Sequence, residues 1–372
     1  MGGSLNPTRV GIVGVGAISG QYLAYFDQHG AEAGVQLTTV ADLNAERARA
    51  AVAGRDGVRA TTPDEVYGAD DVDIVLNLTI PAAHAAVGLA AVAGGKHVYG
   101  EKPLAANAVD ARALLAAAGE AGLRVGSAPD TVLGQGTQTA RALIDDGRIG
   151  QPVAATAFFA CPGHERWHPD PDFYYQPGGG PLFDMGPYYL SALIHLLGPV
   201  ESVYGAAGRS GDERVVGSGD RAGERFPVDV ETHVTGVLRH ENGALSTVLM
   251  SFDVQRHELP RIEVHGTGGS VSVPDPNRFD GQVRLATPGS DGWQDMPLTH
   301  GYAAAGRGLG LADLARALRT DTPARATGEV ALHVLDVMEA LLKASAENRV
   351  VRPASGCERP PLVPESARVA VD

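Results

Sequence analysis

A strand, a glycine turn and a helix follow one another near the amino terminus, and this order constrains the fold more than any other feature. Residues 9–13 form a short apolar run, residues 14–20 read GVGAISG, and the apolar positions that follow recur with helical spacing. The arrangement presents backbone amides and a helix amino terminus to a pyrophosphate. Ser19 replaces the third glycine of the usual pattern, where a small residue suffices for helix–strand packing. The turn predicts cofactor contacts from Gly14, Gly16, Ala17 and Ile18.

An acidic residue stands at the end of the second predicted strand. Residues 35–40 form that strand, and Asp42 follows it directly. A carboxylate at this position binds the ribose hydroxyls of the adenosine, which favours NAD over NADP because no arginine stands ready for a 2′-phosphate. The alternative is that Asp42 only caps the helix predicted over residues 45–53.

The alternation of strands and helices continues to residue 127. Strands are predicted at 73–78, 96–99 and 123–127, and helices at 81–93 and 107–118. Repeated βα units with apolar strands predict a parallel sheet covered on both faces, with ligands beyond the carboxyl ends of the strands. Residues just after two of these strands are therefore expected at the cofactor site: Thr79, Pro81, His84, Glu101 and Lys102.

Lys102 has two interpretations. A lysine that points into a partly apolar cleft can have a lowered pKa and take part in proton transfer. The ordinary fate of a lysine after a strand is a solvated surface position. Spacing alone does not decide between them.

Two ionisable residues four positions apart, Asp184 and Tyr188, follow the triple glycine at 178–180. On a helix they share one face, so a carboxylate and a phenol would point at one place, and the glycines would let a ligand approach the backbone closely. The alternative makes Asp184 only the cap of the helix that follows, with Pro187 tolerated in its first turn.

Taken together, the glycine turn with Asp42, the Glu101-Lys102-Pro103 triplet and the pattern over 178–188 resemble the Gfo/Idh/MocA family, which includes glucose–fructose oxidoreductase and inositol dehydrogenase. The resemblance implies an α/β plus α+β protein. A Rossmann NAD-binding domain would span residues 1–127, and a domain on an open, mostly antiparallel sheet would span 128–372, with substrate bound between them. It also implies that Lys102 is the catalytic lysine, that the peptide before Pro103 is cis, and that Asp184 lies in the substrate pocket.

Tyr188 places the chain on one branch of that resemblance. Inositol dehydrogenase-like members carry histidine there, whereas glucose–fructose oxidoreductase and dihydrodiol dehydrogenase-like members carry tyrosine. A phenol with an ordinary pKa near about 10 is a poor base at neutral pH and needs a neighbouring cation. Lys102 is the natural candidate, so we expect a tyrosine–lysine mechanism with Asp184 as a third catalytic residue.

Residues 164–168 read HERWH, a literal HExxH. A zinc peptidase needs this motif on a helix, but Pro162 and Gly163 precede it and Pro169 follows it, which disfavours a helix, so no metal is expected. We interpret the segment as a substrate loop in which Trp167 offers a ring face to a sugar and His164 or His168 binds its hydroxyls. A surface loop packed on its own tryptophan is the alternative.

Length, net charge and cysteine content limit the kinds of partner expected for this chain. The chain has 372 residues, a formal charge of −14 and two cysteines, Cys161 and Cys357. These features favour a cytoplasmic protein with both thiols reduced, and disfavour nucleic acid and membranes as partners. Short alternating runs after residue 200 predict an antiparallel sheet. A sheet face left uncovered by helices would be buried in a homo-oligomer, a dimer or tetramer.

The sequence thus predicts an NAD-dependent oxidoreductase that moves hydride between nicotinamide and a hydroxyl or keto carbon of a sugar, sugar derivative or cyclic polyol. Two alternatives stay open. One is a glycosidase or lyase of the same family that oxidises its substrate only transiently, and the other is a non-catalytic sensor of NAD or sugar.

Overall fold

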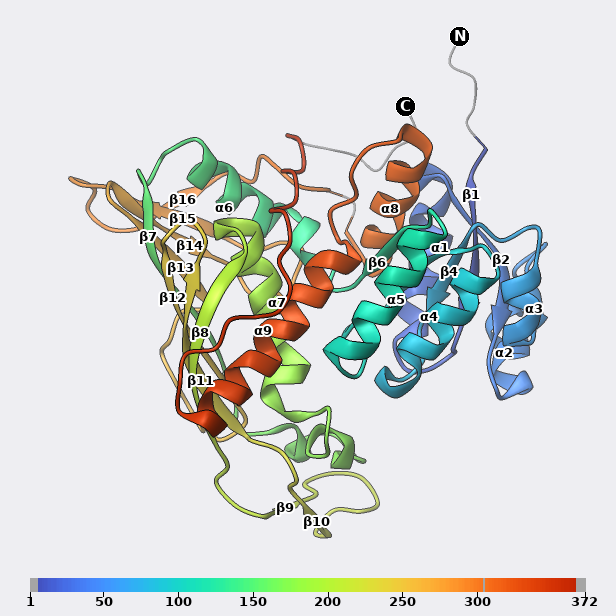
Figure 1. The fold of residues 1–372 in the computed structure, drawn as a ribbon, viewed down its shortest axis with the longest axis horizontal. Coiled ribbons are helices and arrows are strands. Elements are labelled where there is room, and N and C mark those ends of the chain that lie inside the picture. The colour runs from blue at the N-terminus through green and yellow to red at the C-terminus, as the bar shows by residue number, and fades with distance from the viewer. Residues whose placement is uncertain (1–5, 304, 366–372) are drawn as a thin grey trace. The chain divides into compact units, whose positions relative to one another are not determined.

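The computed structural model describes residues 6–303 and 305–365 (Figure 1). Their contacts divide the chain into two compact units. The first unit comprises the described residues of Met1–Gly134, His300–Leu332 and Pro360–Asp372, and the second comprises Gln135–Thr299 and His333–Arg359.

The amino-terminal part of the first unit alternates strands and helices, as the sequence predicts (blue to cyan in Figure 1). Its elements are β1 Thr8–Val13, α1 Ser19–Ala33, β2 Val35–Ala41, α2 Ala45–Val52, β3 Arg59–Thr61, α3 Pro63–Gly68, β4 Ile74–Asn77, η1 Pro81–Ala83, α4 His84–Ala93, β5 His97–Gly100, α5 Ala108–Glu120, β6 Val125–Ser127 and η2 Thr131–Leu133.

Within the described residues, these strands form one six-stranded parallel sheet in the order β3-β2-β1-β4-β5-β6. The chain reverses its winding direction between β1 and β4, and the glycine turn lies there, at the point where such sheets bind ligands. The predicted Rossmann fold is confirmed. β3 and α3 are absent from the prediction because three and six residues carry too little periodicity to detect.

The first unit also includes a returning segment with α8 Leu309–Thr320. Arg319 of this helix donates to the carbonyls of Ala33 and Gly34 at the end of α1. Buried Asp130 accepts hydrogen bonds from the amides of Gly308 and Gly310 at the helix start. These long-range contacts make the first unit discontinuous, in contrast to the single boundary predicted between residues 127 and 128.

The second unit contains the remaining elements. They are α6 Gln135–Asp145, β7 Pro152–Ala160, η3 His164–Arg166, η4 Asp172–Tyr174, α7 Gly180–Leu197, β8 Val200–Gly208, β9 Glu213–Val215, β10 Arg225–Pro227, β11 His233–His240, β12 Leu245–Ser251, β13 Ile262–Gly266, β14 Gly269–Val273, β15 Val283–Ala286, β16 Gln294–Met296 and α9 Gly328–Glu347, which begins in the first unit.

In the described part of this unit, eight strands form a sheet in the order β16-β15-β14-β13-β7-β12-β11-β8, and β9 and β10 form a separate hairpin. All neighbours in the large sheet are antiparallel except β7 and β12. Helix α7 packs on β7, β11 and β12, and α6 packs on β14 and β15 (Figure 1). The expected mostly antiparallel sheet is confirmed.

Helix α7 starts earlier than the capping alternative requires. It begins at Gly180, with Gly179 as its cap and Pro181 in its first turn, where no intrahelical amide partner is lost. Asp184 therefore lies inside the helix, one turn before Tyr188, and the idea that it serves as the helix cap is wrong. The two side chains share one face of a helix that is buried along most of its length.

Of the helices formed by residues 6–303 and 305–365, none combines the length and apolar content that a transmembrane segment needs.

Candidate active site

The glycine turn after β1 is held by backbone contacts. Gly14 has a φ of 101°, and its amide donates to the Ala41 carbonyl at 2.8 Å. A Cβ at Gly14 would lie 2.7 Å from the Leu78 backbone, so a side chain is excluded on steric as well as conformational grounds. In contrast, a Cβ at Gly16 would meet no protein atom within 4 Å. The turn is closed toward the sheet and open above Gly16.

Asp42 completes the turn from the end of β2. Its Oδ2 accepts a hydrogen bond from the Val15 amide at 2.7 Å, and its Oδ1 accepts one from Asn44 at 2.8 Å. Helix α2 is capped by Asn44, whose side chain accepts from the Glu46 amide. The capping alternative for Asp42 is therefore wrong. The carboxylate lies at the glycine turn, as binding of a ribose requires.

The substitution of the third glycine has a local explanation. Ser19 is buried, and its hydroxyl donates to the Gly16 carbonyl at 2.7 Å. The serine thus ties the start of α1 to the turn while remaining small enough for helix packing. Ala17 is exposed and Ile18 half-buried between the two, so these predicted cofactor contacts lie at the open side of the turn.

Two exposed apolar residues at the same sheet edge are absent from the sequence prediction. Leu43, next to Asp42, is 98% exposed, and Ile80, after β4, is 69% exposed. Large apolar side chains so exposed at strand ends are suited to cover an adenine ring. The residues present therefore fit NAD: the turn for the pyrophosphate, Asp42 for the ribose, and Leu43 and Ile80 for the base.

His84 has a different place from the one predicted. It is buried, its Nδ1 lies 2.6 Å from the Pro103 carbonyl oxygen, and its Nε2 lies 3.0 Å from the Thr79 carbonyl oxygen. Both partners are backbone carbonyls. His84 therefore links the loop after β4 to the loop after β5 from a buried position and does not present its ring to a ligand. Thr79 is half-buried and hydrogen-bonded to Asn77, while Pro81 is exposed.

Glu101 and Lys102 follow β5. Glu101 accepts a hydrogen bond from the Tyr22 hydroxyl at 2.8 Å and another from the Lys102 amide at 3.1 Å. Burial, and then the charge of Glu101, raises the pKa of Tyr22 well above its ordinary value. The peptide between Lys102 and Pro103 is cis, as the family resemblance implies. Lys102 is half-buried, which separates it from an ordinary solvated lysine.

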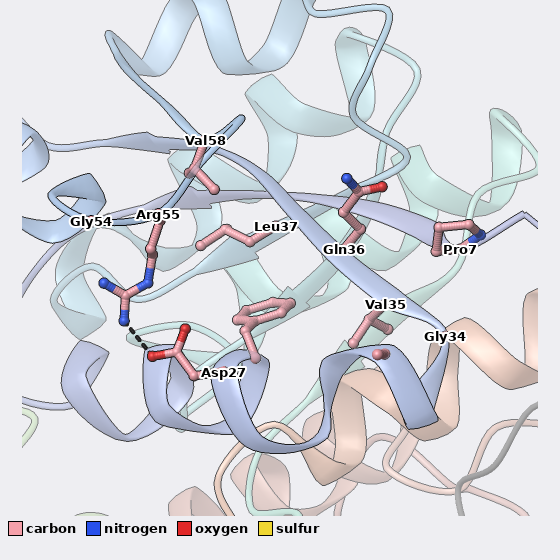
Figure 2. Close-up of a pocket in the computed structure, with 11 residues that line it drawn as sticks. Pro7, Asp27, Gly34, Val35, Gln36, Leu37, Gly54, Arg55 and Val58 are labelled. Atoms are coloured by element: carbon pink, nitrogen blue, oxygen red, sulfur yellow. Dashed lines mark hydrogen bonds and ion pairs between the residues drawn. The ribbon is translucent and has the colours of Figure 1, made fainter.

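A cavity of about 770 Å³ in the first unit is unrelated to this site. Figure 2 shows that residues of α1, of the start of β2 and of the segment after α2 line it, among them Asp27, Gly34 and Arg55. It includes Val35, the first residue of β2, and so opens at the edge opposite to the glycine turn. Asp27 and Arg55 form an ion pair of 2.6 Å across it.

In the second unit, the structure brings His164 and Asp184 together. His164 Nε2 lies 2.9 Å from Asp184 Oδ2, and the two side chains are only 13% and 19% exposed. Burial lowers the pKa of His164, but hydrogen bonds to Asp184 and Cys161 outweigh it and raise that pKa to about 9. This shift favours an imidazolium beside the Asp184 carboxylate.

Aromatic rings surround His164. The ring centroids of Phe252 and Tyr174 lie 4.5 and 4.7 Å from that of His164, and Trp167 lies at 5.3 Å. The Trp167 indole nitrogen is 3.3 Å from His164 Nδ1, a contact that only the neutral imidazole accepts. The neutral ring with its proton on Nε2 satisfies both contacts, whereas the imidazolium has no acceptor left for the indole, so a change in the protonation of His164 alters the surroundings of Trp167.

The HExxH residues do not form the helix that a zinc site would need. Only His164–Arg166 is helical, as a single 3₁₀ turn. Glu165 is buried and paired with Arg214, and His168 Nδ1 accepts from the Asp170 amide. Within the described residues, no three or more His, Cys, Asp or Glu side chains are grouped to hold a metal. The side chains of this motif serve other contacts.

Trp167 and Tyr188 complete the arrangement. Trp167 is 59% exposed, so much of its ring surface is accessible. Tyr188 is buried on α7, one turn after Asp184. The sequence indicates His164 and Asp184 separately but not their pairing, because the chain between them, residues 165–183, is largely irregular and no local pattern predicts how it folds back.

Both units match one protein family. Residues 8–128 match the oxidoreductase family with an NAD-binding Rossmann fold, and residues 137–272 match the GFO/IDH/MocA C-terminal domain. The chain belongs to the Gfo/Idh/MocA family. As a member of that family it is an NAD-dependent oxidoreductase.

Curated relatives agree with this assignment. The chain is 33% identical over 245 residues to 1,5-anhydro-D-fructose reductase of Ensifer adhaerens, covering 64% of this chain and 68% of the relative. It is 28% identical over 271 residues to levoglucosan dehydrogenase of Pseudarthrobacter phenanthrenivorans, covering 68% of each chain. The Gfo/Idh/MocA signature thus extends well beyond the glycine turn.

Solved structures of other proteins share the fold. An NAD-binding oxidoreductase from Klebsiella pneumoniae superposes with a TM-score of 0.82 at 22% identity, over 94% of this chain and all of that one. Levoglucosan dehydrogenase in complex with NADH superposes with a TM-score of 0.78 at 21% identity, again over 94% of this chain and all of that one.

Proposed function

We propose that this NAD-dependent oxidoreductase acts on a hydroxyl or keto carbon of a sugar, a sugar derivative or a cyclic polyol. The observation that carries the proposal is the His164–Asp184 pair. The ring of Trp167 packs against His164, and Asp184 precedes Tyr188 by one helical turn. Carboxylates and aromatic faces are the groups that recognise ring hydroxyls and the apolar face of a sugar ring. The curated relatives named above, a reductase of anhydrofructose and a dehydrogenase of levoglucosan, support this substrate class.

NAD, when bound, accepts or returns the hydride. We propose that the protein's residues handle the proton and the orientation of the substrate. Tyr188 takes the proton of the reacting hydroxyl, and the positive charge of Lys102 favours the phenolate that this step needs. Asp184, kept as a carboxylate by His164, orients the hydroxyls, and Trp167 offers its ring face to the sugar.

In the direction of reduction, the same groups work in reverse: Tyr188 returns a proton to the alkoxide oxygen as hydride reaches the carbonyl carbon. His168 has a smaller part in the proposal. Its ring packs edge-on against Phe173, with centroids 5.3 Å apart, and supports the loop that carries Trp167.

The test is a panel of sugars and polyols assayed with NAD and with NADP by absorbance of the reduced cofactor. Net formation of NADH is expected, which separates a dehydrogenase from an enzyme that oxidises its substrate only transiently. Lys102→Ala and Tyr188→Phe should each lower kcat by about two orders of magnitude or more, the usual worth of a positioned acid or base, with NAD affinity unchanged. Turnover near the wild-type level in both variants would refute these roles.

We also propose that the protein forms a homo-oligomer, a dimer or tetramer, through the large sheet. The sheet face away from α7 carries exposed Tyr204, Val237 and Leu245 on three successive strands. Apolar residues aligned across strands favour burial against another chain. Both cysteines are thiols, which supports a working place in the cytoplasm.

A further inference from the structure

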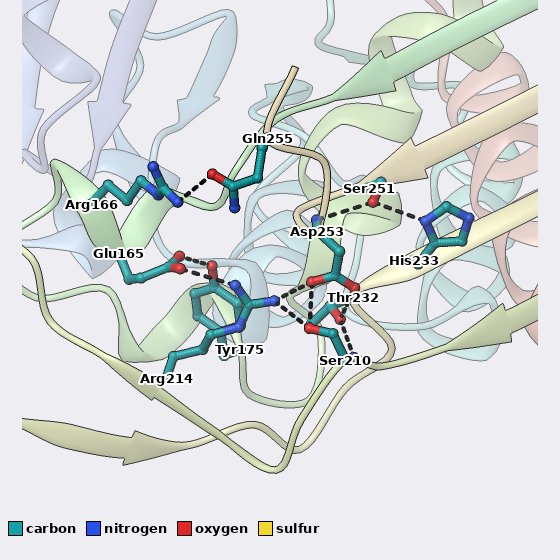
Figure 3. Close-up of polar contacts among 10 residues, drawn as sticks. All are labelled: Glu165, Arg166, Tyr175, Ser210, Arg214, Thr232, His233, Ser251, Asp253 and Gln255. Carbon is teal, nitrogen blue, oxygen red and sulfur yellow. Dashed lines mark hydrogen bonds and ion pairs between the residues drawn. The ribbon is translucent and has the colours of Figure 1, made fainter. Parts of the chain in front are cut away.

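A buried polar cluster adjoins the candidate site, and the proposed reaction does not use it (Figure 3). Arg214 of β9 lies between two carboxylates. Its Nη1 donates to Glu165 Oε1 at 3.0 Å, and its Nη2 donates to Asp253 Oδ1. The side chains of Glu165, Arg214 and Asp253 are 7%, 16% and 13% exposed, so this is an ion cluster largely removed from solvent.

Hydroxyl groups supply the remaining contacts of both carboxylates. The Tyr175 hydroxyl donates to Glu165 Oε2, while Ser210 and Thr232 donate to Asp253 at 2.9 and 2.6 Å. One guanidinium thus serves two carboxylates, and the hydroxyls of Tyr175 and Thr232 bind the carboxylate oxygens that it does not reach. A buried cluster of this kind is tolerable only while its cation stays in place, because removing it leaves two uncompensated negative charges.

The cluster fixes the segment that carries His164. Glu165 follows His164 in the single turn η3, and the Glu165 carbonyl accepts a hydrogen bond from the Gly217 amide at 2.7 Å. Gly217 and Arg214 both belong to the β9–β10 hairpin, residues 213–227. The hairpin therefore holds η3 through the backbone amide of Gly217 and through the side chain of Arg214.

An apolar cluster reinforces the same contact. The buried residues of this cluster come from the hairpin and from positions just after η4, β10 and β12. They are Tyr175, Val216, Phe226, Val228 and Phe252. Phe252 also packs against the His164 ring. A displaced hairpin would therefore shift both the backbone next to His164 and the ring against which His164 rests.

We propose that Arg214 is a positioning residue for the candidate active site: by pairing with Glu165 and Asp253 together, it holds η3 where His164 meets Asp184. The inference rests on the proposed role of the His164–Asp184 pair in binding the substrate. Arg214 acts through Glu165 and is not itself a catalytic residue. Without it, Glu165 and Asp253 share a buried site with no cation between them, and the turn that carries His164 loses its anchor.

Trp167 provides a readout that needs no turnover. The chain has two tryptophans, so Trp293→Phe leaves Trp167 as the single one. Its fluorescence should follow the protonation of His164, since the two rings are in contact. The titratable groups that face His164 are Asp184 on α7, Cys161 after β7 and Tyr174 on η4. Arg214 itself does not face His164, and its removal leaves the carboxylates of Glu165 and Asp253, which favour the imidazolium, so a fall in the midpoint must come from displacement of η3.

The experiment compares Arg214→Met, Arg214→Lys and Arg225→Met in the Trp293→Phe background. Arg225 is the matched control, an arginine of the same hairpin whose ion pair with Glu213 is exposed. The Trp167 titration should have a midpoint near pH 9 in the parent and the Arg225 variant. In Arg214→Met it should fall by about one pH unit or more, equivalent to a tenfold weaker preference for the imidazolium. Arg214→Lys, which keeps the charge, should be intermediate.

Catalysis should follow the same order. With the best substrate of the panel, kcat/KM of Arg214→Met should fall about tenfold or more while NAD affinity stays at the parent value, and Arg225→Met should match the parent. An unchanged Trp167 midpoint in Arg214→Met, or an equal shift in Arg225→Met, would overturn the proposal. Because fluorescence requires no reaction, this outcome is separate from failure of the sugar oxidoreductase assignment. If Arg214→Met does not fold, Glu165→Gln combined with Arg214→Met removes one of the two unpaired charges and carries the same test.

Discussion

We propose that the side chain of Asp42 serves both the fold and the binding of the cofactor. One carboxylate oxygen accepts from the Val15 amide in the glycine turn, and the other accepts from Asn44 at the start of α2. The charge is therefore fixed at the place where an adenosine ribose would bind. A 2′-phosphate placed there would be repelled, which explains the preference for NAD in physical terms.

Replacing Asp42 by alanine should relax this preference. We expect the ratio of kcat/KM for NAD over NADP to fall roughly tenfold, or about 1.4 kcal/mol, because the repulsion of the 2′-phosphate and the ribose acceptor are both lost. Steady-state kinetics with both cofactors measures it. Asp27→Ala, which removes a carboxylate at the opposite sheet edge, should leave the ratio unchanged. If Asp42→Ala keeps the wild-type ratio, Asp42 does not contact the ribose.

His164 is the second residue whose environment decides its chemistry. Its ordinary pKa of 6.5 is raised to about 9, since hydrogen bonds to Asp184 and Cys161 outweigh burial. A group whose pKa is raised on folding stabilises the folded state fully below the unfolded value. That contribution is lost as the pH rises through the folded value. The relevant window for His164 thus lies between about pH 6.5 and pH 9.

We expect His164→Gln to lower the free energy of unfolding at about pH 6, by about 3 kcal/mol at most, and to have much less effect at about pH 10. Urea unfolding of the wild type and the variant at both pH values gives the difference directly. His265→Gln, a change at a partly exposed histidine beside Glu263, serves as the control. A loss of stability in His164→Gln that does not depend on pH would contradict the ion pair with Asp184.

At the scale of elements, long periodic segments were predictable and short ones were not. The strand over 9–13 and the helix over 107–118 correspond to β1 and α5 within one or two residues. The β9–β10 hairpin was missed because each of its strands has three residues. Its position depends on Arg214, whose carboxylate partners at 165 and 253 are remote in sequence.

The glycine turn gives a prediction that separates folding from cofactor binding. Gly14→Ala should destabilise the protein by about 1–3 kcal/mol, since it strains the backbone and overlaps Leu78. Gly16→Ala should leave the thermal unfolding of the NAD-free protein unchanged but weaken NAD binding about tenfold or more, because its Cβ fills the open side of the turn. Calorimetry without and with NAD measures both effects. Wild-type NAD affinity in Gly16→Ala would place the pyrophosphate elsewhere.

At the scale of the whole molecule, the chain builds each unit from distant parts. Helix α8 returns to the first unit through Arg319 and through Asp130, which holds the helix start, although more than 170 residues lie between these partners. The domain boundary inferred from sequence was a single break, because composition changes little at residues 300–332. Only contacts between distant residues reveal a discontinuous unit.

The proposed oligomer makes its prediction at the same scale. Wild-type protein should sediment as a species heavier than the 38.5 kDa chain. Val237→Glu, which puts a charge on the exposed sheet face, should shift it toward the monomer, because an uncompensated charge is costly in an apolar interface. Val215→Glu, a similarly exposed valine on the β9–β10 hairpin, should not. A wild-type protein that sediments only as a monomer at micromolar concentration would contradict the proposal.

The sequence alone determined the Rossmann unit, the place of the glycine turn, Asp42 and Lys102, and the spacing of Asp184 and Tyr188, because these follow from local periodicity and from motifs a few residues long. Only the tertiary structure decided that His164 pairs with Asp184, that His84 lies beneath two loops, and that Glu165 of the HExxH motif is bound by Arg214. Each of these depends on irregular chain or on partners distant in sequence, where packing and charge pairing leave no periodic pattern to recognise.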